Sequence, residues 1–170
     1  MKLEVTFRIT SDNLFDAVVG FTGEAVLPRQ VIAPICTLTQ MVFIEGQELR
    51  TALQEALGSL GPFMNRSGVF LMVRGGNPQE LVQGCSQNPF GLQLMCEKCK
   101  DFSNMCYSKK NSHYLATCKL CAHKFKVSMP EGYTPCPGAN QSFGHGLFWS
   151  PFPLGGQYRR WKQGDQLFLV

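Results

Sequence analysis

The sequence predicts an α+β fold, with a small mixed sheet and two helices followed by a cysteine-rich module and an irregular, aromatic-rich segment. Three observations support this class. Apolar residues alternate at period two in residues 3–9, they recur at helical spacing in residues 47–57, and two Cys-x-x-Cys pairs follow. The 170 residues are 44% hydrophobic, which is enough for a packed core. We expect an α+β domain in residues 1–93, the cysteine module in 94–127, and a segment at 128–170 that packs back on the domain.

The first elements of the expected domain come from residues 2–44. Residues 2–10 have the alternation of a half-buried strand, and residues 11–19 can form a short helix that starts with a capping Ser-Asp pair and ends before a glycine. Residues 23–27 and 31–44 are expected to be extended. The second of these is rich in β-branched residues, although Pro34 interrupts it.

The strongest helix signal lies in residues 47–57, where leucine and alanine recur at helical spacing before a glycine. Residues 68–74 then predict a buried strand. The resulting order of strand, helix, strand, strand, helix, strand is that of a split βαβ unit. Residues 77–90 contain two Asn-Pro pairs, so we expect a connection or a short helical turn there.

The C-terminal residues are rich in glycine, proline and aromatic side chains. They are too apolar for a disordered tail and too often broken for helices, so we expect them to wrap back onto the domain. Residues 167–170 predict a short strand paired with a sheet. No stretch has the apolar length of a signal peptide or of a membrane span, and the expected location is therefore intracellular, in the cytoplasm or nucleus.

Four cysteines carry the chemistry of the central module. Cys96 and Cys99 form one Cys-x-x-Cys pair, and after eighteen residues Cys118 and Cys121 form the second. Zinc takes four tetrahedral ligands, and each pair can place two thiolates on one ion. Disulfides are the alternative in an oxidising compartment. Redox chemistry is a further alternative, but it requires a Cys-x-x-Cys pair at the start of a helix in a βαβ unit, which neither pair has.

The residues between the two pairs add to this pattern. Residues 102–107 and 113–117 can pair as strands across a polar turn, which places a cysteine pair beside each strand of a hairpin. Residues 96–126 therefore resemble the zinc-ribbon class found in transcription and RNA-processing proteins. The resemblance implies one structural zinc ion and a ribbon shape, and it implies no particular partner.

The positive charge of the chain is concentrated on this module. The net charge is +4, yet residues 1–93 carry six basic against eight acidic residues, whereas residues 94–126 carry seven lysines against two acidic residues, a net of +5. Aromatic residues alternate with the lysines, as on surfaces that bind phosphates and stack on unpaired bases. The alternative is that the rings form the hairpin's own core and the lysines protect its edges. We expect binding to nucleic acid, either RNA or single strands, through Lys98, Tyr107, Lys109, Lys110, Tyr114, Lys119, Lys124 and Lys126.

A second function is a protein-interaction module in which the zinc is purely structural. Exposed aromatic residues favour protein interfaces, and the C-terminal segment contains several. A partner would then dock on Phe148, Trp149, Phe152, Tyr158 and Trp161.

A third function is an enzyme that uses Cys136 and His145 as a nucleophilic pair. The local sequence offers neither a third ligand nor an orienting carboxylate. The common phosphate-loop, serine-hydrolase and zinc-protease motifs do not occur, so we expect a non-enzymatic regulatory or adaptor protein. The other candidate side chains are expected to be ordinary: His113 and His123 solvated or locally bonded, and Cys36, Cys85 and Cys106 small buried hydrophobes.

Overall fold

The computed structural model describes residues 15–22, 28–58, 60, 64, 67–101, 103–110, 113–141, 143–152, 160–163 and 166–169. In chain order the elements are β1 (Ala17–Phe21), α2 (Pro28–Phe43), α3 (Leu49–Gly58), β2 (Val69–Val73), β3 (Gln79–Gly84), the 3-10 turn η1 (Pro89–Gly91), β4 (Gln93–Leu94), β5 (Met105–Lys110), β6 (His113–Cys118), β7 (Lys124–Val127), β8 (Thr134–Pro135), β9 (Gly146–Pro151), β10 (Arg160–Gln163) and β11 (Gln166–Leu169).

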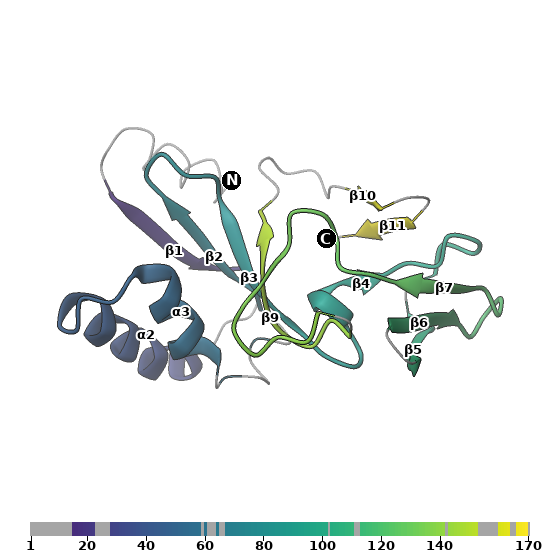
Figure 1. Ribbon diagram of the computed structural model, residues 1–170, viewed down its shortest axis with the longest axis horizontal. Helices are drawn as coiled ribbons and strands as arrows, with labels where there is room; N and C mark the ends of the chain where they lie inside the picture. Colours follow the sequence, from purple (N-terminus) through teal and green to yellow (C-terminus); the bar gives the residue numbers. More distant parts are fainter. Residues whose placement is uncertain are drawn as a thin grey trace.

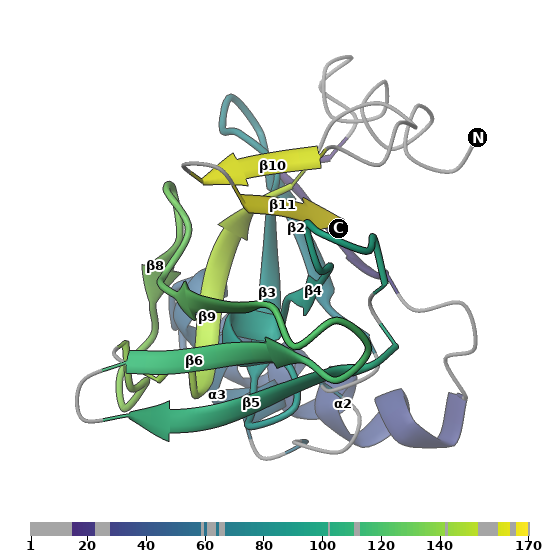
Figure 2. The ribbon, with the colours of Figure 1, turned by 90° about the vertical axis from the view of Figure 1, so that its right-hand side faces the viewer.

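The described strands form three antiparallel sheets. The largest has the order β1-β2-β3-β9-β8, and the others are β5-β6-β7 and β10-β11-β4. Figure 1 shows α2 and α3 at one end of an elongated molecule and the β5-β6-β7 sheet, here called the ribbon sheet, at the other. In Figure 2 the ribbon sheet lies in front of the central strands. The α+β class is confirmed, and the recorded strand pairs are antiparallel instead of mixed.

Two core clusters lie on opposite faces of the five-stranded sheet. The first contains Leu53 and Leu57 of α3 together with Trp149 of β9. The second contains Phe148 of β9 together with Tyr114 of the ribbon sheet. Successive side chains of a strand point to opposite faces, so Phe148 and Trp149 place β9 between the two clusters. The helices therefore cover one face of the sheet and the ribbon sheet packs on the other.

The prediction of an extended segment at residues 31–44 is wrong, because these residues form most of α2. Its inner side carries Val31, Pro34 and Leu38, which are buried or half-buried at helical spacing. Leu38 packs against the first core cluster beside α3. This contact outweighs the strand preference of the β-branched residues, which is weak and depends on context.

The predicted helix at residues 11–19 is also wrong over its described part, because Ala17–Phe21 forms β1. Antiparallel pairing with β2, from Ala17 opposite Val73 to Phe21 opposite Val69, supplies hydrogen bonds that the short helix would have had to make alone. The predicted strand at 2–10 and extended segment at 23–27 lie outside the described residues. The split βαβ order is not found among the described elements, which begin β1, α2, α3, β2.

The other predicted elements agree more closely with the structure. The helix at 47–57 and the strand at 68–74 are confirmed as α3 and β2. Residues 77–90 contain the start of η1, which is the short helical turn expected there. They also contain β3, a central strand that the two Asn-Pro pairs gave no reason to expect. The final strand is confirmed as β11, which pairs with β10 and β4. None of the described helices is long and apolar enough to cross a membrane.

Candidate metal centre

The first Cys-x-x-Cys turn follows β4 and is closed by two backbone hydrogen bonds. The Cys96 N–H donates to the Asp101 carbonyl, and the Lys100 N–H donates to the Cys96 carbonyl, both at 2.8 Å. This closure requires a left-handed backbone at Lys100, whose φ is +60°. The turn thus brings the thiol of Cys99 back toward that of Cys96.

The second turn repeats the first after β6. The Cys118 N–H donates to the His123 carbonyl, and the Ala122 N–H donates to the Cys118 carbonyl, both at 2.9 Å. Ala122 takes the same left-handed conformation, with φ of +58°. The two turns therefore present their cysteines in equivalent ways.

The four sulfur atoms converge. All of them lie within 4.8 Å of one another, and the Sγ atoms of Cys96 and Cys121, like those of Cys99 and Cys118, are 3.4 Å apart. Four sulfurs bound tetrahedrally at 2.3 Å from one ion would be separated by about 3.8 Å. A disulfide would need a separation of about 2 Å, and all four thiols are free. The residues fit a tetrahedral metal ion, with two buried ligands and two half-buried ones.

Backbone hydrogen bonds prepare one of these thiols for ionisation. Burial opposes the thiolate of Cys96, but the N–H groups of Cys99 and Lys98 donate to its sulfur. The Cys121 thiol also donates to it, and the pKa of Cys96 falls to about 7. Amide donors of this kind stabilise metal-bound thiolates in the same way.

Cys99 and Cys121 resist ionisation when no cation is near. The Asp101 N–H favours the thiolate of Cys99, yet burial and the neighbouring thiols outweigh it and raise the pKa of Cys99 to about 12. The His123 N–H acts likewise on Cys121, whose pKa is also raised by burial and by Cys96. Four thiolates in this space repel one another, so only a bound cation allows all four to ionise. Because protein sulfurs fill every tetrahedral position, such an ion would be structural.

The ribbon sheet separates the predicted nucleic-acid residues by face. Residues paired across antiparallel strands share one face, and burial alternates along β6. The inner face packs on the second core cluster and carries Met105, Tyr107, Lys109, Tyr114, Ala116, Cys118, Phe125 and Val127. The opposite side, here called the outer face, carries Cys106, Ser108, Lys110, His113, Leu115, Thr117, Lys124 and Lys126.

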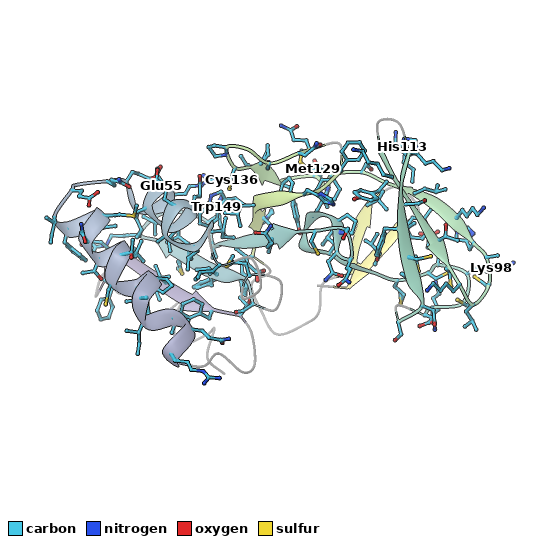
Figure 3. The ribbon with its side chains drawn as sticks, turned by 90° about the horizontal axis from the view of Figure 1, so that it is seen from below. Glu55, Lys98, His113, Met129, Cys136 and Trp149 are labelled. Carbon is cyan, nitrogen blue, oxygen red and sulfur yellow. The ribbon has the colours of Figure 1, made fainter. Side chains whose placement is uncertain are left out.

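All six predicted lysines are exposed, but they do not share one face. Lys110, Lys124 and Lys126 lie on the outer face, and Figure 3 shows Lys98 near the same end of the molecule. Lys109 points to the other side, where its Nζ lies 4.0 Å from the ring centroid of Phe143. Lys98 and Lys119 belong to the two cysteine turns.

The two tyrosines predicted to stack on bases are part of the core instead. Tyr114 is only 5% exposed, and its hydroxyl shares a 2.7 Å hydrogen bond with His145 Nε2. Tyr107 is half-buried against the second core cluster, and burial raises its pKa to about 12. Both rings lie on the inner face, because a small hairpin uses its own aromatic residues to form a core.

The other cysteines have separate surroundings. The Cys106 thiol donates to the Thr117 carbonyl at 3.2 Å, and Cys85 is half-buried. The expectation that Cys36 is a buried strand residue is wrong, because it lies exposed on α2. Burial raises the pKa of Cys136 to about 11, although the positive charge of Arg50 acts to lower it. The Cys136 thiol is therefore a weak nucleophile at neutral pH.

The structure places Cys136 and His145 in different surroundings. Cys136 packs in the first core cluster with Trp149, and Figure 3 shows these two side by side. His145 bonds to Tyr114, a member of the second cluster. Of the remaining histidines, His113 lies half-buried on the outer face, and His123 packs at 5.9 Å from the Phe125 ring.

The aromatic C-terminal residues do not form an exposed docking surface over their described part. Phe148 and Trp149 are 0% and 1% exposed, so this part of the docking prediction is wrong. The guanidinium of Arg50 covers the Trp149 ring at 4.9 Å, and Phe152 packs on Phe70 with ring centroids 4.8 Å apart. The side chains of Tyr158 and Trp161 lie outside the described residues.

The chain matches no protein-family model, no curated protein and no solved structure.

Proposed function

We propose that the protein is a non-enzymatic binding protein in which one zinc ion stabilises the ribbon sheet and the outer face of that sheet binds the phosphate backbone of nucleic acid. Zinc is the proposed metal because four thiolates at tetrahedral spacing favour this soft, redox-inactive ion. The ligands would be Cys96, Cys99, Cys118 and Cys121.

The charge of the outer face is the observation that carries this proposal. Lys110 at the end of β5 and Lys124 and Lys126 on β7 project from one side of the sheet. The three strands contain no acidic residue. Lysines gathered on one side of a sheet whose strands carry no acidic residue attract polyanions such as nucleic acids.

The same face supports phosphate contact better than base stacking. Its eight residues include no phenylalanine, tyrosine or tryptophan, because the tyrosine and phenylalanine rings of the three strands all lie on the inner face. Single-strand binding proteins usually stack bases on exposed rings, whereas backbone contacts are shared by duplexes and single strands. We therefore expect duplex RNA or DNA to bind at least as tightly as a single strand of the same length.

Salt dependence provides a quantitative test. If the three lysines each neutralise one duplex phosphate, the slope of log K against log salt concentration contributed by them is about −2.7. Fluorescence anisotropy with a labelled duplex, titrated at several salt concentrations, measures this slope. The triple variant Lys110→Gln, Lys124→Gln and Lys126→Gln should lose most of the affinity and most of the slope.

Lys109→Gln is the matched control. Lys109 is the neighbour of Lys110 on the same strand and is also exposed, but it lies over Phe143 on the other side of the sheet. It should therefore retain most of the affinity. Metal analysis of each variant shows whether the ribbon sheet is intact. A triple variant that holds one metal ion per chain and binds duplex with unchanged affinity and slope would refute the proposal and favour a protein partner.

A further inference from the structure

The helix α2 is apolar on both its inner and its outer side. Val31 and Pro34 are buried on the inner side. On the outer side Ile32 is 59% exposed, Ile35 is 45% exposed, and Phe43 at the end of the helix is 82% exposed. A helix that is apolar all round is normally covered all round, so the outer side of α2 lacks a covering element among the described residues.

The exposed residues form a continuous stripe. Ile32, Cys36, Thr39 and Phe43 follow one another at intervals of three or four residues, which places them on one side of a helix. Thr39 adds little polarity, because its hydroxyl donates to the Ile35 carbonyl of the preceding turn at 2.8 Å. The stripe therefore presents mainly carbon and sulfur to its surroundings.

The charges at the two ends of α2 indicate what covers the stripe. Residues 30–44 contain no charged side chain, and the uncharged stretch is bounded by Arg29 and Glu45, both exposed. The helix itself spans sixteen residues, or about 24 Å. Glu45 lies two residues beyond its end, where the side-chain amides of Gln40 and Gln47 donate to its exposed carboxylate. Two copies of α2 packed antiparallel would place Arg29 of each copy beside Glu45 of the other, whereas parallel packing would oppose like charges.

We propose that the outer side of α2 is a homodimer interface, with the two helices antiparallel about a two-fold axis that passes near Thr37. The self-complementary order of cation, apolar stripe and anion is what an isologous interface requires. In this arrangement Ile32 of one copy lies near Phe43 of the other. The interface is independent of the proposed function, because α2 and the ribbon sheet occupy opposite ends of the molecule (Figure 1).

Sedimentation velocity over a dilution series tests the apolar part of the proposal. The intact protein should show a concentration-dependent change from dimer to monomer. Phe43→Glu should raise the dissociation constant at least about tenfold, as loss of a large aromatic interface residue does. Leu120→Glu is the matched control: Leu120 is also a large exposed apolar residue, at 67%, but it lies in the second cysteine turn, and its variant should dimerise as before.

A charge exchange tests the antiparallel geometry. Arg29→Glu alone places two carboxylates together at both ends of the interface and should weaken the dimer by about fivefold. The double variant Arg29→Glu with Glu45→Arg restores both opposite-charge pairs and should recover most of the affinity. Far-UV circular dichroism of each variant shows that α2 is folded.

Four outcomes would overturn the dimer: a protein that stays monomeric at all concentrations, a dimer that Phe43→Glu leaves unchanged, a double variant no tighter than Arg29→Glu, or a monomer that binds phosphatidylcholine and phosphatidylglycerol vesicles through Phe43. None of them bears on the lysines of the outer face.

Discussion

Loss of Cys118, a ligand of the proposed metal ion, should unfold the ribbon sheet and leave the helical end of the protein folded. Cys118 is fully buried at the end of β6, and the same strand places Tyr114 and Ala116 in the second core cluster. Without metal, the raised pKa values of Cys99 and Cys121 keep the four cysteines from ionising together. The end of β6 then loses the metal ion that would hold it to the first cysteine turn.

The structure indicates the size of this effect. Burial of Tyr114 and Val127, the two large fully packed side chains that the ribbon sheet adds to the second cluster, contributes about 1.5–3 kcal/mol each, or about 3–6 kcal/mol together. That is smaller than the conformational entropy cost, about 1–2 kcal/mol per residue, of ordering the ribbon sheet. The first core cluster contains no residue of the ribbon sheet and includes Trp149, so it should survive.

The assay combines metal analysis, limited proteolysis and tryptophan fluorescence in a Trp161→Phe background, where Trp149 is the one reporter. Cys118→Ser should lose the metal and become sensitive to proteases between residues 94 and 127, while the emission of Trp149 stays blue-shifted. Cys106→Ser is the control, because serine can keep the hydrogen bond to the Thr117 carbonyl. Retention of one metal ion and an unchanged melting temperature in Cys118→Ser would refute this account of the site. Simultaneous exposure of Trp149 would refute the independence of the two clusters.

Two further predictions concern stability. Ala122→Gly should stabilise the protein by about 0.5–1 kcal/mol, because relief of the left-handed backbone (about 1–2 kcal/mol) exceeds the entropic cost of glycine (about 0.5–1 kcal/mol). Thermal melts of the variant and the intact protein measure this difference, and a lower melting temperature of the variant would contradict the prediction. Burial raises the pKa of Glu80 above its usual 4.5 although the Thr22 hydroxyl donates to it, so the folded protein retains a proton that the unfolded chain releases. Stability should therefore fall as the pH rises from about 4.5 toward the folded pKa, and Glu80→Gln should remove this fall. The free energy of unfolding of both proteins, measured by denaturation across the pH range, tests this. The same pH dependence in the two proteins would show that Glu80 does not titrate in this way.

The clustering of the four cysteines could be predicted from the sequence because the pattern that indicates it is local. Each pair of ligands is separated by two residues, and the turn that joins them closes through hydrogen bonds within six residues. The helix α3 was predictable for a similar reason, since its apolar spacing agrees with the face it buries. The left-handed residues Lys100 and Ala122 carried no signal, because neither is the glycine or asparagine that usually marks such a backbone.

The elements that were predicted wrongly depend on distant partners. The segment that became α2 contains apolar residues at both strand and helix intervals, and its packing beside α3 selected the helix. Residues 17–21 became a strand because β2, some fifty residues later, offered an edge. Local propensities differ by about 1 kcal/mol or less per residue, so contacts of this kind readily override them.

By itself, the sequence determined the α+β class, the four convergent cysteines and the concentration of lysines around them, since these follow from composition and short spacing. Only the tertiary structure decided which side of the ribbon sheet each lysine occupies, and it separated Lys109 from its neighbour Lys110. It also buried Tyr114, Phe148 and Trp149, which the sequence allowed to be binding residues. The physical reason is that aromatic and basic residues serve cores and surfaces alike, and the choice between them depends on which face of each strand meets the rest of the protein.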